Sequence, residues 1–101
     1  MTDISANEVL VRLKNGEHLN LLDVRAEMEY HTFNIGGTNI PLPELVNNLD
    51  ELDWNKNDEI IVICKLGLRS ATAKSILELN GYQNIRNLTG GLIAYQKTQQ
   101  K

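Results

Sequence analysis

The sequence predicts an α/β fold of three layers, in which a mostly parallel central sheet of about four to five short strands carries helices on both faces. Segments with helical periodicity alternate with short apolar runs, and their connections are short, an order that is typical of parallel sheets with crossover helices. The unbroken apolar run Ile60–Ile63 is typical of a strand buried on both faces. At 101 residues, the chain has the length of a single domain, which we place at residues 1–101.

The N-terminal part of the chain predicts a helix, a strand and a second, short helix. Ser5 and Glu8 have the spacing of a capping box, and Gly16 stands where a helix with that start would end. Residues 19–24 are typical of a short strand, and residues 25–32 of a short helix. The apolar face of the first helix consists of Ala6, Val9, Leu10 and Leu13.

Glycine and proline organise the next stretch. Gly36 and Gly37 predict a turn before a brief extended piece at residues 38–40. Pro43 suits the first turn of another helix, and the polar residues 53–58 predict a loop that leads into the central strand. The apolar face of this helix, at helical spacing, consists of Leu42, Leu45, Val46 and Leu49.

The C-terminal part repeats the order of helix and strand. A helix follows the central strand, and Gly81 stands at the position of a left-handed C-terminal cap. Residues 83–88 predict a last short strand, Gly90 and Gly91 a turn, and residues 92–98 a last helix. The helix after the central strand has an apolar face made of Ala73, Ile76 and Leu77.

Composition excludes several classes of function. A formal net charge of −3 gives no electrostatic footprint for nucleic acid or for an anionic membrane. No apolar run is long enough to span a bilayer, and the first ten residues lack the basic region and apolar core of a secretory signal. We therefore expect a cytoplasmic protein, and, since no exposed apolar seam is evident, a monomer.

The chain has a single cysteine, Cys64, so no internal disulfide can form. Any sulfur species built on this residue must be passed to another molecule. His18 and His31 stand apart from any cluster with metal-ligand spacing. We expect neither a metal nor a cofactor.

Cys64 lies where α/β proteins commonly place reactive groups, at the carboxyl end of a buried strand and before a helix. A tight loop there can turn several N–H groups toward one point, and the helix dipole adds positive charge. Lys65 and Arg69 add full charges at the rim. Such surroundings stabilise a thiolate and attract an anion, so we expect an anionic sulfur that is open to solvent. The alternative is a buried structural cysteine.

Three blocks of sequence, in order along nearly the whole chain, carry a family resemblance. The first block consists of Leu22–Arg25, Glu29-Tyr30 and Ile35–Pro41 and is similar to LDVR…EY…HI-x-GA-x-NIP. The second, Cys64–Ser70, is similar to C-R-x-G-x-R-S. The third consists of Asn87–Gly91 with Ala94 and Tyr95 and is similar to L-x-GG-x-x-AW. Together they resemble the rhodanese-like (sulfurtransferase) family, in its single-domain form.

This resemblance implies a sulfurtransferase in which Cys64 takes the outer sulfur of thiosulfate or a persulfide and passes it to a thiol or cyanide. The covalent persulfide would replace any cofactor. The implied partners are a small anionic donor such as thiosulfate and, in some settings, a protein thiol or persulfide. Asp23 and Arg25 would support the loop, or would form a purely structural ion pair. The implied donor-binding loop consists of Lys65, Leu66, Gly67, Leu68, Arg69 and Ser70.

Two other functions remain open from the sequence. Tyrosine-phosphatase-like enzymes and arsenate reductases resemble the motif H-C-x5-R. Here four residues separate Cys64 from Arg69, so the loop between the cysteine and the arginine is one residue shorter than in that motif. In addition, Ile63 replaces the histidine. A binding or regulatory module of the same fold is the other alternative. Leu66 and Leu68 would give the site an apolar lip that favours a protein or bulky thiol acceptor, unless they pack back on the helix.

Overall fold

The computed structural model describes residues 2–99, which contain a four-stranded, entirely parallel sheet. The strand order is β2-β1-β3-β4, so the longest strand lies inside the sheet. An isolated parallel bridge between Ile4 and Leu88 extends the pairing beyond β4. The strands are β1 (Leu21–Asp23), β2 (Thr38–Asn39), β3 (Ile60–Ile63) and β4 (Ile85–Asn87).

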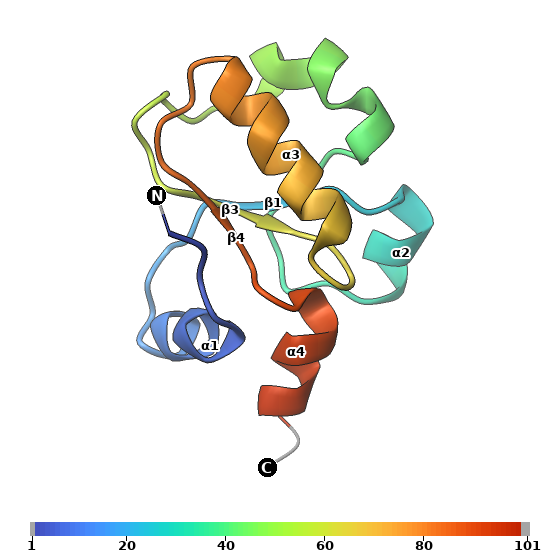
Figure 1. Cartoon of the computed structure of the whole chain (residues 1–101). Helices are drawn as coiled ribbons and strands as arrows, with labels where there is room; N and C mark the ends of the chain where they lie inside the picture. The colour runs from blue at the N-terminus through green and yellow to red at the C-terminus, as the bar shows by residue number, and fades with distance from the viewer. Residues whose placement is uncertain (1, 100–101) are drawn as a thin grey trace.

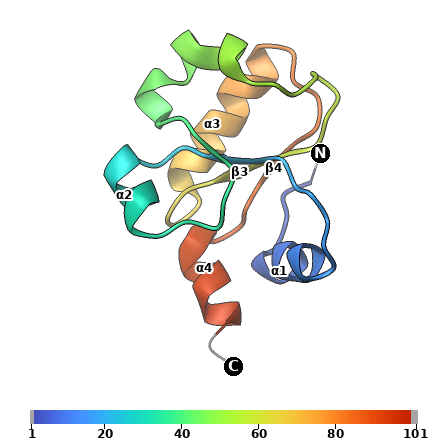
Figure 2. The ribbon, with the colours of Figure 1, turned by 180° about the vertical axis from the view of Figure 1, so that it is seen from behind.

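Helices cover both faces of this sheet, which confirms the predicted three layers. Figure 1 shows α3 and the two 3-10 segments η1 and η2 on one face and α1 and α4 on the other, and Figure 2 shows the same arrangement from behind. Helix α2 lies beyond one end of the sheet, beside the loop that joins β3 to α3. The helices are α1 (Ala6–Lys14), α2 (Glu27–Thr32), η1 (Leu42–Glu44), η2 (Val46–Glu51), α3 (Leu68–Leu79) and α4 (Gly91–Thr98).

Strand β3 divides the core into two clusters because its side chains alternate between the faces of the sheet. All four of its side chains are fully buried. Ile60 and Val62 belong to the cluster under α3, together with Leu45 and Leu77. The cluster under α1 and α4 consists of Ile4, Ala6, Val9, Leu19, Leu21, Ile61, Ile63, Leu88, Leu92 and Tyr95.

The helix predicted after Pro41 is instead two 3-10 segments, η1 and η2. A 3-10 helix has three residues per turn, so side chains three apart align and the predicted α-helical face is lost. Leu45 is fully buried, but Val46 is 59% exposed. Asn48 has φ −125°, outside the helical range, and marks a kink in η2.

The remaining elements lie close to their predicted positions. Strand β3 spans its predicted residues, whereas β1, β2 and β4 are shorter than their predicted ranges. Helix α3 begins at Leu68, inside the predicted loop, so that Arg69 and Ser70 belong to its first turn. Gly81 has φ +92° and closes α3 as expected. Within the described part of the chain, no helix combines the length and the apolar character that a membrane crossing requires.

Candidate active site

The backbone after β3 turns two N–H groups onto the sulfur of Cys64. The Gly67 N–H donates to Sγ at 3.0 Å and the Ser70 N–H at 3.3 Å. The Ser70 hydroxyl oxygen also lies 3.3 Å from Sγ. This turn requires Gly67 at its N-cap position, because its φ is +96°, a conformation that other residues rarely adopt. Two of the amides that were expected around the thiol therefore donate to its sulfur.

These hydrogen bonds act against the effect of burial on the Cys64 thiol. Burial is the largest single influence and raises the pKa of Cys64, because it disfavours the thiolate. The Ser70 hydroxyl and the amides of Ser70, Gly67 and Leu66 together outweigh it, so that the pKa of Cys64 lies below its ordinary value. The loop thus favours the nucleophilic form of the sulfur.

The thiol is not open to solvent, contrary to the expectation from the sequence. Cys64 is only 1% exposed, because it follows β3 directly and packs in the core layer under α3. It nevertheless lies at the base of a cup of about 180 Å³. Leu66 and Leu68 are 56% and 75% exposed, so they project outward as an apolar lip. The cup is lined by Cys64, Lys65, Leu66, Leu68 and Arg69.

Arg69 does not offer the free positive charge that its place in the loop predicts. Its guanidinium donates to both carboxylate oxygens of Glu29, from Nη1 to Oε1 at 2.6 Å and from Nη2 to Oε2 at 3.0 Å. The pair holds the pKa of Glu29 down at about 2, so the carboxylate is charged at neutral pH. Lys65, which makes no ion pair with the described residues, carries the unpaired charge of the loop.

Asp23 and Arg25 form a buried ion pair, with 2.7 Å between Nη2 and Oδ2. The same guanidinium donates to the backbone carbonyls of Glu29 and Phe33, at 3.3 and 2.6 Å. The pair thus joins the end of β1 to helix α2. This geometry fits the structural alternative, in which Arg25 holds α2 against the loop.

Asn87, at the end of β4, is a site residue for which no role was predicted from the sequence. Its side-chain amide donates to the Gly67 carbonyl at 3.0 Å, and its Oδ1 accepts from the Ser70 hydroxyl. It therefore joins the turn to the residue that contacts the thiol. Its position at the end of a predicted strand could have indicated this role, because the carboxyl ends of neighbouring parallel strands lie at the same edge of the sheet.

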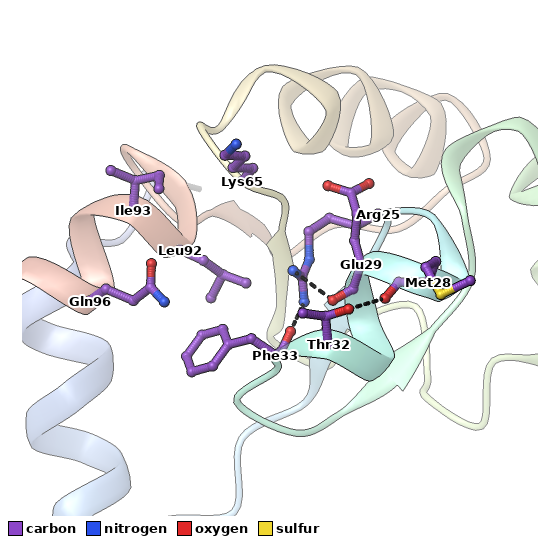
Figure 3. Close-up of a pocket in the computed structure, with 9 residues that line it drawn as sticks. All are labelled: Arg25, Met28, Glu29, Thr32, Phe33, Lys65, Leu92, Ile93 and Gln96. Atoms are coloured by element: carbon purple, nitrogen blue, oxygen red, sulfur yellow. Dashed lines mark hydrogen bonds between the residues drawn. The ribbon is translucent and has the colours of Figure 1, made fainter.

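A second cavity, a groove of about 310 Å³, lies beside the cup between α2 and α4. Figure 3 shows α4 side chains on one side and α2 side chains on the other, with the Arg25 guanidinium between them. Lys65 lines both the groove and the cup. The groove is lined by Arg25, Met28, Glu29, Thr32, Phe33, Lys65, Leu92, Ile93 and Gln96. Among residues 2–99, no three metal-ligating side chains come together.

Comparison with known proteins agrees with this architecture. Residues 5–98 match the rhodanese-like domain. The chain belongs to the rhodanese-like family. The family resemblance drawn from the three sequence blocks is thereby confirmed.

Two proteins that are similar in sequence to this chain carry names from sulfur chemistry. The chain is 36% identical over 91 residues to the putative sulfur carrier protein YrkF of Bacillus subtilis, covering 89% of this chain and 48% of that protein. It is 38% identical over 72 residues to the thiosulfate sulfurtransferase PspE of Escherichia coli, covering 70% of this chain and 68% of PspE. The chain thus spans only about half the length of YrkF.

A solved structure gives the same result. The human single-domain sulfurtransferase TSTD1 superposes with a TM-score of 0.80 at 26% sequence identity, covering 94% of this chain and 95% of that one. The rhodanese fold of the chain is therefore shown by its structure as well as by its sequence.

Proposed function

We propose that this rhodanese-like chain is a sulfurtransferase that carries sulfane sulfur on Cys64. The observation that supports this most strongly is the convergence of the Gly67 and Ser70 N–H groups on Sγ, within 3.0 and 3.3 Å. The same donors would stabilise a persulfide anion on that atom. The names of PspE and TSTD1 support the same reaction class.

The proposed reaction has two half-steps and is redox-neutral overall. The Cys64 thiolate attacks the outer sulfur of the donor, which is thiosulfate or a persulfide. The new bond joins Sγ to that sulfur, the sulfur–sulfur bond of the donor breaks, and its electron pair leaves on sulfite or on a thiolate. An acceptor thiolate or cyanide then attacks the outer sulfur of the Cys64 persulfide, and the electron pair of the broken bond returns to Sγ.

The roles of the loop residues follow from their positions. The amides of residues 65–70 would hold the sulfur anion, and Lys65 at the rim would attract the donor. Leu66 and Leu68, which project from the cup, would contact an acceptor, and their apolar surface suits a protein thiol or another bulky thiol.

Intact-mass measurement tests the proposal. We expect purified protein to gain the mass of one sulfur atom after exposure to thiosulfate or, in a separate reaction, to an organic hydropersulfide. Cyanide or a dithiol should remove this sulfur. Cys64→Ser should keep the fold, since it changes one atom, and should load no sulfur, because a hydroxyl is a poor nucleophile at neutral pH.

A binding module of the same fold is the second candidate, and the 1% exposure of Cys64 is the observation that favours it. The measurement above separates the two functions. If iodoacetamide alkylates Cys64 but neither donor loads it, the thiol is accessible without being a sulfur carrier, and the binding function is correct.

A further inference from the structure

We propose that the donor to Cys64 is a singly charged or neutral organic sulfane-sulfur compound whose apolar body lies in the groove between α2 and α4. Inorganic thiosulfate, a compact dianion, would be a poor donor by comparison. This inference rests on the proposed function and narrows its substrate class. It combines two separate observations, the charge balance around Cys64 and the apolar groove beside it.

The charges around the cup do not favour a dianion. The residues that line the two cavities, together with their ion-pair partners, include the cations Arg25, Lys65 and Arg69 and the carboxylates Asp23 and Glu29. Once Cys64 is a thiolate, positive and negative charges are equal in number. Electrostatic attraction of a dianion needs an excess of positive charge, so Glu29 removes the excess that Arg69 would otherwise provide.

The groove has the size and lining of a site for a small organic molecule. Its volume of about 310 Å³ lies in the range of ligand pockets, which are mostly apolar with a few polar groups. Met28 is 78% exposed and Phe33 37% exposed, and in Figure 3 the side chains of Phe33 and Leu92 lie toward one another. An apolar ligand body would cover these surfaces.

The groove adjoins the cup that contains Cys64, and the two cavities share Lys65. The Leu92 N–H donates to the Cys64 carbonyl at 2.9 Å, and the Ile93 N–H to the Lys65 carbonyl at 3.1 Å, so one wall of the groove is bonded to the loop. Lys65 lines both cavities. A ligand in the groove would therefore bring a singly charged head group to Lys65 and its outer sulfur to the cup.

Three stable donors allow the effect of donor charge on the loading rate to be measured separately from the effect of apolar size. Thiosulfate carries two charges, methanethiosulfonate carries one charge with a methyl group, and benzenethiosulfonate carries one charge with a phenyl ring. In the thiosulfonate reaction the Cys64 thiolate takes the outer sulfur, the sulfur–sulfur bond breaks, and its electron pair leaves on a sulfinate. The rate of sulfur loading is measured by intact mass at a pH where the thiol is ionised.

The first test concerns the groove. We divide each loading rate by the rate of the same donor with N-acetylcysteine, which corrects for leaving-group chemistry. The corrected rate for benzenethiosulfonate should exceed that for methanethiosulfonate by about fivefold. Met28→Gln should lower the benzenethiosulfonate rate about threefold and should lower the methanethiosulfonate rate by less, because a methyl group covers less of the groove. Leu79→Gln is the matched control, because Leu79 is 87% exposed and lines neither cavity.

The second test concerns the charge balance. Glu29→Gln should raise the thiosulfate rate about tenfold and the methanethiosulfonate rate about threefold, because the logarithm of the rate scales with donor charge. Alkylation by neutral iodoacetamide should not change. Glu27→Gln makes the same charge change in α2, where Glu27 faces His31 and not the loop, and should change none of the three rates.

The outcomes separate this inference from the proposed function. Equal corrected rates for the two thiosulfonates, or a thiosulfate rate that Glu29→Gln leaves unchanged, would overturn the inference while sulfur transfer itself stands. Loss of loading from all three donors, with normal alkylation by iodoacetamide, would overturn the proposed function and the inference with it.

Discussion

At the scale of single residues, Cys64 and Asn87 compete for one hydroxyl proton. The Ser70 oxygen lies 3.3 Å from Sγ and also hydrogen-bonds to Oδ1 of Asn87. The bond from the Asn87 amide to the Gly67 carbonyl fixes this orientation of the side chain. When the Cys64 thiol is protonated, the Ser70 hydroxyl can donate its hydrogen bond to Asn87. When the thiol ionises, the thiolate requires that same hydroxyl as a hydrogen-bond donor. Ser70 thus contributes directly to the lowered pKa of Cys64.

Ser70→Ala should raise the pKa of Cys64. The hydroxyl favours the thiolate, so its loss should move the midpoint of the pH–rate profile for iodoacetamide alkylation upward. Ser75→Ala is the control, because Ser75 lies on the same helix but bonds only the Ala71 carbonyl. A midpoint that does not move would show that the amides alone hold the thiolate.

At the scale of elements, helix α4 is seated on the active-site loop. Its first residue, Gly91, has φ +62°, and a Cβ at that position would collide with the carbonyl groups of Cys64 and Lys65. Only a glycine allows the backbone of α4 to approach the loop so closely. This contact holds the carbonyl side of the loop while the opposite N–H groups face the sulfur.

Gly91→Ala should therefore destabilise the fold more than a glycine replacement elsewhere. We expect a loss of about 2–4 kcal/mol in the free energy of unfolding, from backbone strain together with the collision. Gly16→Ala is matched to it, since Gly16 has φ +83° with no atom close to a new Cβ, and should cost about 1–2 kcal/mol. Urea denaturation measures both. Equal losses would mean that the approach of α4 relaxes at little cost.

Helix α2 depends on the buried pair of Asp23 and Arg25. Arg25→Met removes the bonds to the carbonyls of Glu29 and Phe33 and leaves Asp23 buried without its partner, so we expect a loss of about 3–5 kcal/mol in unfolding free energy. The double variant Asp23→Leu with Arg25→Met should recover most of this loss, because no buried charge remains. If Arg25→Met unfolds at the same urea concentration as wild type but loads no sulfur, Arg25 acts on the donor instead.

At the scale of the whole molecule, one carboxylate joins three elements at the edge of the sheet opposite the active site. Glu59 precedes β3 and accepts hydrogen bonds from Arg12 of α1, at 2.7 and 3.0 Å, and from Arg86 of β4, at 2.9 Å. The bonds from Arg12, opposed in part by burial and assisted by Arg86, keep the pKa of Glu59 below its usual value. The ionised carboxylate is therefore more favourable in the folded state than in the unfolded chain.

This linkage predicts a loss of stability in acid. A folded pKa below the unfolded one adds stability above the unfolded pKa, and that contribution is lost as pH falls through the folded pKa. Glu59→Gln should lower the unfolding free energy by about 1–2 kcal/mol at pH 7, and the difference from wild type should shrink as pH falls below the ordinary pKa of a glutamate.

Urea denaturation across this pH range measures the effect of Glu59→Gln. Glu51→Gln is the control, because Glu51 is exposed and makes no ion pair with the described residues. A difference between Glu59→Gln and wild type that stays constant with pH would show that packing, and not charge, connects these elements.

The sequence by itself determined the layers of the fold and the position of the reactive loop. Alternating helical and strand patterns, the apolar run of β3 and the glycines at positive φ act over a few residues, so local physics specifies them. The amides around Sγ follow from the same locality, because Gly67 and Ser70 lie within six residues of Cys64. These features were predictable from chain neighbours alone.

Only the tertiary structure decided the charge and access of the site. Glu29 neutralises Arg69 from 40 residues away, and Asn87 reaches Ser70 across 17; no local pattern contains either pairing. The burial of Cys64 depends on how the core layer under α3 packs around the end of β3. Side-chain partners and solvent access depend on which distant elements meet, whereas the backbone turn that holds the sulfur depends on a single short segment.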